Sequence, residues 1–307
     1  MHEVSLYSGM QIQNISDEQK LQDIVFGKNL SSGTFTKPYD ITSYFGRLYI
    51  TDTMSSLVHV LDVPNRHYFY FGYRKKGKLN KPTGITVDDQ GMVYVTDTGN
   101  HRVQVYDSLG LFQRNIGGKS YLSHPVAVTV DSDSDHIYVV DNGGVSSNKH
   151  RVVVFNMKGK YLFSFGNRGK DLGEFNLPAD ITTAEDGTIY VLDAGNFRVQ
   201  VFDSDGNFIR SWGSIGKRAG NFARPRRMAI DKQGYLYISD GFFNNVQIFN
   251  STGNIMLAVG QQGNVDGPGK FSLIAGLWVD ETGRIYVIDQ LFRKIEVFRP
   301  VKHGFFK

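Results

Sequence analysis

Hydrophobic and polar residues alternate in many short runs along this chain, and clusters of Asp, Asn and Gly separate the runs. Arg102–Tyr106 and Arg198–Phe202 show the pattern clearly, because each has Val at its second and fourth positions. A period of two in segments rich in β-branched and aromatic residues is typical of strands, and the polar clusters are typical of tight turns. The pattern predicts a protein built almost entirely from short antiparallel strands.

A five-residue motif, Leu/Ile/Val-Tyr-Ile/Val-x-Asp, recurs six times along the chain. The copies are Leu48–Asp52, Val93–Asp97, Ile137–Asp141, Ile189–Asp193, Leu236–Asp240 and Ile285–Asp289. Their Asp residues are separated by 45, 44, 52, 47 and 49 positions. A strand-rich repeat of this length is typical of the blades of a β-propeller. The sequence therefore predicts an all-β, six-bladed β-propeller of four-stranded antiparallel blades.

Each repeat predicts four strands, which we name a to d from the centre of the ring outwards. In such a blade the d–a connections and the b–c turns emerge on one face, and the a–b and c–d turns emerge on the other. The last copy lacks strand d, and a short apolar run that ends at a Gly, Ile24–Phe26 before Gly27, precedes the first copy. We expect this N-terminal strand to pair with Lys294–Phe298, because a shared blade removes two free sheet edges. The propeller would then span residues 24–299, between an N-terminal extension (1–23) and a C-terminal tail (300–307).

The six motif Asp residues are expected to serve the blades themselves. A residue present in every copy is best explained by a structural role, here by accepting backbone hydrogen bonds in the b–c turn. Asp40 and Asp180 differ, because they occupy the same rim position in blades 1 and 4, which face each other across a six-membered ring. We expect them either to be solvated or to share a contact with a cation or substrate.

Two segments, Asp97–Val105 and Asp193–Val201, resemble the NHL repeat, whose members form six-bladed propellers. The resemblance covers roughly residues 24–299. The segment Val4–Gly9 further resembles exported bacterial propellers that often carry a lipid anchor. This second resemblance implies an extracytoplasmic location, periplasmic or on the outer surface, with an anchor missing from this sequence. A cytoplasmic location is left open.

The sequence offers no catalytic or metal-binding motif. It contains no Cys, and its eight His lack metal-ligand spacing. Amide-forming lyases that resemble this chain in fold place zinc-binding His directly after the Pro of strand a. The corresponding residues here are Tyr39, Thr83, Val126, Ala179, Arg226 and Ala275. We therefore expect a non-catalytic protein without zinc, haem or another cofactor, although oxygen ligands leave calcium open.

Charge is sorted between the two predicted faces. The net charge is only +4. The d–a connections, however, hold 14 basic and three acidic residues, and the turns of the opposite face sum to −8. No apolar stretch approaches the length of a membrane-spanning helix. A face with this surplus of cations favours capture of an anionic partner.

The predicted binding residues lie on this basic face and at the channel rim. They are Lys75, Lys76, Lys78, Lys81, Lys217, Arg218, Arg224, Arg226, Arg227, Tyr39, Asp40 and Asp180. Two adjacent arginines at the channel mouth, Arg226 and Arg227, suit a carboxylate, phosphate or sulfate. The leading hypothesis is a binding module for an acidic protein, such as a multihaem cytochrome, or for an anionic polysaccharide. Alternatives are single-stranded RNA binding and a lyase or lactone hydrolase. RNA binding needs exposed aromatic residues for base stacking, and the candidates are Tyr39, Tyr73, Tyr121, Phe222, Phe242, Phe243 and Phe292.

Overall fold

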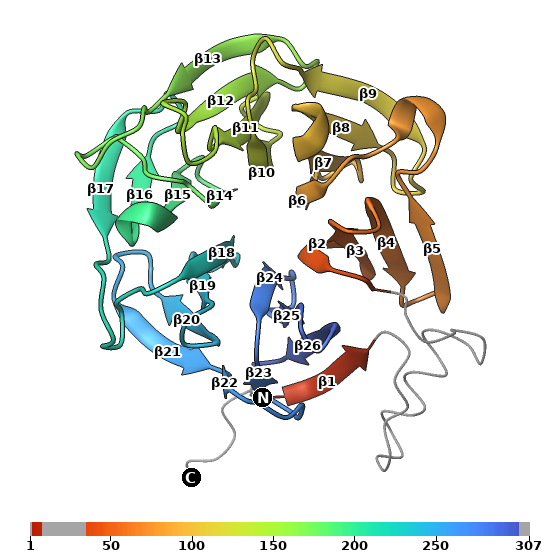
Figure 1. The fold of residues 1–307 in the computed structure, drawn as a ribbon, viewed down its shortest axis with the longest axis vertical. Helices are drawn as coiled ribbons and strands as arrows, with labels where there is room; N and C mark the ends of the chain where they lie inside the picture. Colours follow the sequence, from red (N-terminus) through yellow and green to blue (C-terminus); the bar gives the residue numbers. More distant parts are fainter. Residues whose placement is uncertain (1, 8–34, 301–307) are drawn as a thin grey trace.

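Six four-stranded antiparallel sheets surround a central axis (Figure 1) in a computed structural model that describes residues 2–7 and 35–300. In each sheet the strands follow one another from the axis outwards, with strand order equal to chain order in blades 1 to 5. This arrangement confirms the prediction of an all-β, six-bladed propeller. We number the blades 1 to 6 along the chain.

Strands a and b are the two inner strands of every blade, and strand b contains the five-residue motif. The a strands are β2 (Pro38–Tyr44), β6 (Pro82–Val87), β10 (Pro125–Asp131), β14 (Asp180–Thr183), β18 (Pro225–Ile230) and β24 (Ile274–Val279). The b strands are β3 (Arg47–Asp52), β7 (Val93–Asp97), β11 (His136–Asp141), β15 (Ile189–Asp193), β19 (Leu236–Asp240) and β25 (Ile285–Asp289). The motif Asp is therefore the last residue of every b strand.

The two outer strands complete each blade. The c strands are β4 (Leu57–Asp62), β8 (Arg102–Tyr106), β12 (Arg151–Asn156), β16 (Arg198–Phe202), β20 (Asn245–Phe249) and β26 (Lys294–Phe298). The d strands are β5 (His67–Phe71), β9 (Phe112–Gly117), β13 (Tyr161–Phe165), β17 (Phe208–Trp212), β21 (Ile255–Val259) and β1 (His2–Tyr7). A short parallel pair, β22 (Gln261–Gln262) and β23 (Lys270–Phe271), joins blade 5 to blade 6.

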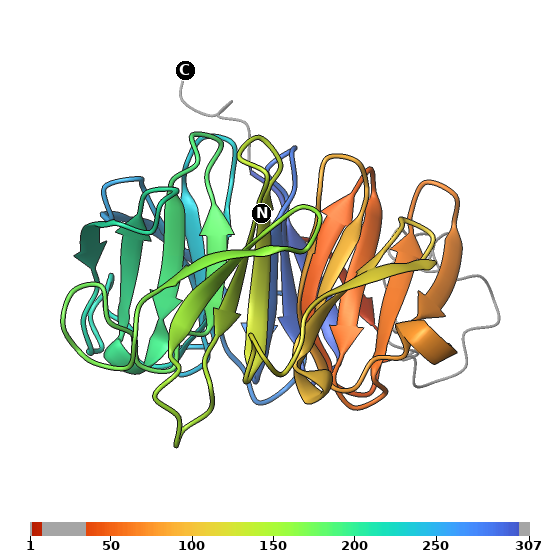
Figure 2. The same cartoon turned by 90° about the horizontal axis from the view of Figure 1, so that it is seen from above.

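The d–a connections and b–c turns share one face, as predicted. Three short 3-10 helices mark it: η1 (Lys75–Gly77) lies in a d–a connection, whereas η2 (Thr98–Asn100) and η3 (Ala194–Asn196) lie in b–c turns. All three lie on the lower side of the ring in Figure 2. We call this side the d–a face. Within the described residues, no helix is both long and apolar enough to cross a bilayer.

The last blade is completed by a different N-terminal segment from the predicted one. Strand β1 (His2–Tyr7) pairs antiparallel with β26, with Tyr7 opposite Lys294 and Leu6 opposite Ile295. The other edge of β26 pairs with β25. The predicted partner Ile24–Phe26 lies outside the described residues, and both edges of β26 are taken without it. Residues assigned from sequence to an N-terminal extension thus form the outer strand of blade 6.

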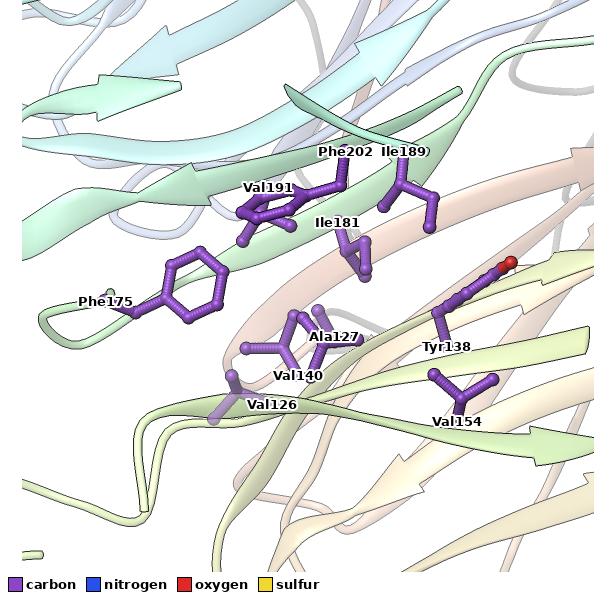
Figure 3. Packing of buried hydrophobic residues seen from close by; sticks show 11 residues of the cluster. Val126, Ala127, Tyr138, Val140, Val154, Phe175, Ile181, Ile189, Val191 and Phe202 are labelled. Atoms are coloured by element: carbon purple, nitrogen blue, oxygen red, sulfur yellow. The ribbon is translucent and has the colours of Figure 1, made fainter. Parts of the chain in front are cut away.

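The hydrophobic core consists of apolar layers between neighbouring blades. Figure 3 shows the layer between blades 3 and 4, where Val140 and Val154 lie on one side and Val191 and Phe202 on the other. Phe175, from the d–a connection, is fully buried in the same layer. Because the a, b and c strands bury apolar residues between neighbouring blades, removal of apolar surface from water holds the ring together.

Candidate functional site

The motif Asp residues fasten the loops of the d–a face to the blades. Asp52 accepts hydrogen bonds from the backbone N–H groups of Thr36 and Lys37, at 2.6 and 2.9 Å, through Oδ2. Its Oδ1 accepts bonds from the backbone of Met54 and Ser55 in the b–c turn, both at 3.0 Å. The other blades use the same type of contact. The predicted role, accepting backbone hydrogen bonds in the b–c turn, is confirmed in blades 1, 5 and 6. In all six blades the carboxylate also holds the d–a connection.

Several basic residues of the b–c turns are paired inside their own blades. Arg102 Nε lies 3.0 Å from Asp97, and Arg198 Nε lies 2.8 Å from Asp193. In blade 6 a fully buried Lys294 takes this place, and its Nζ contacts Asp266 at 2.7 Å as well as Glu296. These cations stabilise the blade and are not available to a partner.

The predicted binding cations of the d–a connections behave differently. Seven of them are exposed: Lys75, Lys76, Lys78, Lys81, Lys217, Arg218 and Arg224. Within residues 35–300, none of the seven forms an ion pair with a carboxylate. An exposed cation without a fixed counter-ion retains its full charge for an incoming anion. The d–a face therefore presents these charges outward.

Arg227 is not part of that exposed surface, which corrects the sequence-based prediction. Only 3% of the residue is exposed, and its guanidinium lies at the channel axis between blades 1 and 4. Its Nη1 donates a 2.7 Å hydrogen bond to the carbonyl of Ala179. The guanidinium carbon also lies 4.8 Å from the centre of the Tyr39 ring, a cation–π distance.

Asp40 and Asp180 flank this guanidinium, and both are 93% buried rather than solvated. Arg227 Nε lies 3.5 Å from Asp40 Oδ1, and Nη1 lies 3.8 Å from Asp180 Oδ1. The cation shared by the two carboxyls is thus an arginine of the protein itself. Each carboxyl also crosses to the next blade, since Asp40 accepts from Ile85 N–H and Asp180 from Met228 N–H. The cluster locks four blades at the channel mouth.

The charge state of the cluster depends on burial. Burial raises the pKa of Asp40 to about 7, although Arg227 opposes the rise and the neighbouring Asp180 adds to it. Burial likewise raises the pKa of Asp180, again opposed by Arg227. The Arg227 pKa is raised by the two carboxyls despite its own desolvation. Near neutral pH the guanidinium therefore remains charged while Asp40 titrates.

Beside the cluster, Arg226 and Tyr39 are half-buried at the mouth. Burial lowers the pKa of Arg226, and the nearby cations Arg224 and Arg227 lower it further. Its Nε is buried without a hydrogen-bond partner among the described residues. Of the two arginines predicted at the rim, only Arg226 therefore lies where it can add its charge to that of the exposed cations of the d–a face.

The channel interior behind the cluster is narrow. A cavity of about 30 Å³ lies between the a strands, with Asp40, Asp180, Thr86 and Thr129 in its wall. This volume accommodates about one or two water molecules, whereas small-molecule sites usually occupy hundreds of Å³. Among the described residues, no group of three or more His, Asp or Glu is placed to hold a metal ion.

A larger hollow, which sequence reasoning missed, lies on the outside of the ring between blades 1 and 2. It has a volume of about 730 Å³. Its wall includes the exposed side chains of Tyr70, Tyr73, Leu109 and Leu111. An alignment of the six repeats could have found it, because apolar residues here replace small or polar ones in the sister blades.

The exposed aromatic residues of the d–a face are fewer than the sequence suggested. Tyr73, Tyr121 and Phe242 are 47%, 45% and 53% exposed. Phe222 is fully buried, and Phe243 is half-buried. Three rings thus remain accessible on this face among the candidates named for base stacking within the described residues.

Sequence profiles agree with this fold. A profile described as NHL repeat matches residues 79–106, 122–155 and 175–202, which fall in blades 2, 3 and 4. A profile described as 6-bladed beta-propeller matches residues 232–299, in blades 5 and 6. The chain is a six-bladed β-propeller that contains NHL repeats.

Similarity to curated proteins is confined to part of the chain. This chain is 34% identical over 95 residues to "Protein brain tumor" of Drosophila melanogaster, and the match covers 30% of this chain and 9% of that protein. The chain spans no more than 30% of the length of the curated relatives it matches first. These matches show that segments of this chain are similar in sequence to segments of those proteins. They do not show the function of this chain.

Solved structures share the architecture. A Bacteroides thetaiotaomicron protein of unknown function has a TM-score of 0.67 at 21% identity, covering 90% of this chain and 73% of that one. Virginiamycin B lyase of Staphylococcus aureus, an inactive variant with quinupristin, has a TM-score of 0.60 at 16% identity, covering 87% and 96%. At such identities the similarity shows the fold alone.

Proposed function

We propose that this propeller is a non-catalytic binding module that docks an anionic partner onto its d–a face. One observation carries the proposal. The cations of the repeat are paired inside the blades, as with Arg102 and Arg198, whereas seven exposed cations of the d–a connections have no carboxylate partner among the described residues. The cations that stabilise the blades are thus different residues from the exposed cations that we assign to partner binding.

The favoured partner is an acidic protein, and an anionic polysaccharide has matching chemistry. Each exposed ion pair contributes little, about 1 kcal/mol or less. Affinity therefore depends on several cations acting together, and salt should weaken it. The exposed cations come from two d–a connections, the one from blade 1 to blade 2 and the one from blade 4 to blade 5, where Arg226 follows. A partner that spans the channel mouth contacts the cations of both connections.

The test compares two variants that change the net charge equally. The first replaces Lys75, Lys76, Lys217 and Arg218 on the d–a face by Glu. The matched control replaces Arg66, Lys158, Lys160 and Lys232, exposed residues in turns of the opposite face, by Glu. Binding of polyglutamate, polygalacturonate and oligouridylate is measured by biolayer interferometry across a salt series.

We expect wild type and control to bind polyglutamate in a salt-dependent way, and the d–a variant to lose that binding. Preference for polygalacturonate would identify a polysaccharide partner on the same face. Equal loss in both variants would mean that only net charge matters. Absence of binding to every polyanion by the wild type would refute the proposal.

Single-stranded RNA binding is the second candidate, because Tyr73, Tyr121 and Phe242 are exposed on the same side as the cations. Aromatic rings among cations can stack bases, at about 1–3 kcal/mol per base. Replacing the three rings by Ser should weaken oligouridylate binding and leave polyglutamate binding unchanged if RNA is the partner. Tight oligouridylate binding that depends on these rings would replace the first proposal by this one.

A further inference from the structure

The outer groove between blades 1 and 2 combines exposed apolar side chains with cations. It lies between β5 and β9 (Figure 1), and η1 borders it on the d–a face. Tyr70 and Tyr73 are 48% and 47% exposed, with ring centres 5.4 Å apart. From the neighbouring blade, Leu109 and Leu111 are 59% and 58% exposed. Two blades thus contribute large apolar side chains to one hollow.

These side chains depart from the repeat at every position. Tyr70 lies two residues before the Gly that ends strand d. The residues at that position in blades 2 to 5 are Asn115, Ser164, Ser211 and Ala258. Tyr73 directly follows the same Gly. Its counterparts in blades 2 to 5 are Gly118, Asn167, Ser214 and Gln261. The aromatic pair is therefore not needed to build a blade.

The two leucines in the c–d turn of blade 2 show the same departure. Leu109 and Leu111 flank Gly110, which is held in a left-handed conformation with φ of 80°. The residues that flank the equivalent Gly in blades 3 to 5 are Lys158 and Lys160, Asp205 and Asn207, and Thr252 and Asn254. The sister blades thus place polar residues in this turn, as expected for a solvent-exposed position. Exposed leucines that converge with exposed tyrosines indicate a surface that a partner covers.

Cations line the same groove. Arg74, Lys75 and Lys76 belong to its wall, and none of them forms an ion pair with a carboxylate among the described residues. Arg74 Nε donates a 3.0 Å hydrogen bond to the Tyr73 hydroxyl, which fixes the guanidinium beside the ring. The d–a connection of blade 1 also forms the helical turn η1, whereas those of blades 3 and 4 form a parallel bridge. In this connection both the backbone and the side chains therefore differ from those of the sister blades.

We infer that this groove binds a short peptide segment of a partner protein in which acidic residues stand next to large apolar ones. The inference rests on the proposed function and deepens it, because it names the subsite and the partner chemistry. Apolar side chains of the peptide fill the space between the tyrosines and leucines, and its carboxylates meet Arg74, Lys75 and Lys76. Such an arrangement of a buried apolar centre with a polar rim is typical of protein interfaces.

Peptide chemistry fits the groove better than other polyanions do. Leu109 and Leu111 have no π-system to stack a nucleobase and no group to bind a sugar hydroxyl. They gain free energy only by burial against apolar atoms. Tyr70 and Tyr73 supply broad contact area at low entropic cost and are the residue type enriched at interface centres.

The test uses substitutions that the sister blades already contain at these positions. The groove variant is Tyr70→Ser, Tyr73→Asn, Leu109→Thr and Leu111→Asn, and it alters no charge. The matched control removes exposed side chains of the same types from blades 3 to 5, as Tyr161→Ser, Tyr235→Asn, Ile209→Thr and Met256→Asn. The probes are a fluorescent peptide alternating Glu with Leu and Phe, the same peptide with Ser in place of Leu and Phe, and oligouridylate.

We expect wild type and control to bind the acidic apolar peptide at least about tenfold more tightly than the Ser peptide. The groove variant should lose that preference while it retains polyglutamate binding. An unchanged preference in the groove variant, or equal loss in the control, would overturn the inference. Oligouridylate binding that depends on the same four residues would overturn it in favour of RNA.

The two proposals can fail separately. If the Ser peptide and the apolar peptide bind wild type equally, the groove is not used, and the proposed function still stands. If the charge-reversed d–a variant binds polyglutamate as wild type does while the groove preference persists, the basic-face proposal fails and the groove remains. Far-ultraviolet circular dichroism and thermal melts of all variants establish that each one is folded.

Discussion

Blades 1 and 4 face each other across the ring and have the same four strands, yet they differ in how they use their polar positions. In blade 4 the carboxylate of Asp193 accepts hydrogen bonds from Asn196, Arg198 and Gln200 at 2.8, 2.8 and 3.2 Å. Arg198 continues to two carbonyls of the d–a connection, and Gln200 bonds to the same connection. This network is internally complete and leaves little charge for a partner.

Blade 1 keeps the Asp and loses the rest of the network. Ser55, Leu57 and His59 occupy the positions of Asn196, Arg198 and Gln200. His59 Nε2 lies 3.8 Å from Asp52, and its Nδ1 lies 2.8 Å from the Tyr68 hydroxyl.

The comparison teaches that the blade requires the Asp and tolerates different residues around it. Blade 1 nevertheless forms its four strands. Its c–d pairing is continuous, whereas the c–d pairings of blades 2 to 5 each contain a register shift. It is also the blade whose outer rim contains Tyr70 and Tyr73. Divergence from the repeat network and part of the new surface thus occur in the same blade.

Removing the arginine that joins the two blades should have the largest effect on stability. Arg227→Met leaves Asp40 and Asp180 buried without their cation. Breaking a buried pair in this way costs about 3–5 kcal/mol of the free energy of unfolding. Urea denaturation measures the loss, and the exposed Arg224→Met serves as control with an expected change within about 0.5 kcal/mol. Similar values for the two variants would contradict the bridging role of Arg227.

Converting blade 4 toward blade 1 should have the next largest effect. Arg198→Leu installs the residue that blade 1 has at this position and leaves Asp193 and two carbonyls short of donors. We expect a loss of about 2–3 kcal/mol, measured by urea denaturation. The reciprocal Leu57→Arg adds a cation near Asp52 and should change stability by less than about 1 kcal/mol. If Arg198→Leu is as mild as its reciprocal, blade 4 does not depend on its network.

The smallest expected effect is the pH dependence of stability that two groups of blade 1, Asp40 and His59, contribute. The Asp40 pKa is raised to about 7, so its contribution is lost as pH rises from about 4 to 7. Burial lowers the pKa of His59 to about 4, opposed by Asp52, so its contribution is lost as pH falls from about 6.5 to 4. The two slopes oppose each other, each with a limit of about 1.4 kcal/mol per pH unit.

Single substitutions should expose each slope in turn. With His59→Gln, which installs the residue of blades 2, 4 and 5, stability should fall more steeply as pH rises between about 4 and 6.5. With Asp40→Asn, stability should rise over the same interval. Urea midpoints measured at several pH values test both signs, and parallel curves for the two variants would show that neither group titrates as described.

Local pattern was enough to predict the strands, the six blades, the sorting of loops by face and the structural Asp residues, because these features repeat in the sequence. It was not enough to place Arg227. Arg226 and Arg227 are adjacent and look alike, but a register shift in β18 between Pro225 and Arg227 turns one toward the axis and leaves the other at the mouth. Its partners Asp40 and Asp180 come from other blades, and only the closed ring brings them together.

The closing strand shows another limit of local pattern. Short segments compatible with a strand occur both at His2–Tyr7 and at Ile24–Phe26. Only one strand can occupy the outer edge of β26, and local pattern does not decide between two candidates. The groove between blades 1 and 2 was missed for a related reason, since Tyr70 and Leu109 belong to different repeats and meet only when neighbouring blades pack.

The pairing of β1 with β26 also imposes an order on biosynthesis. A ribosome makes His2–Tyr7 first, and the strand that receives it, Lys294–Phe298, about 290 positions later. Blades 1 to 5 are built from consecutive residues and can assemble while the chain emerges, whereas blade 6 stays incomplete until residue 298 has left the exit tunnel. During that interval β1 has no partner strand, and both of its edges are open to pairing with another chain. Strand β1 must remain unpaired while the roughly 290 residues that lead to β26 are made.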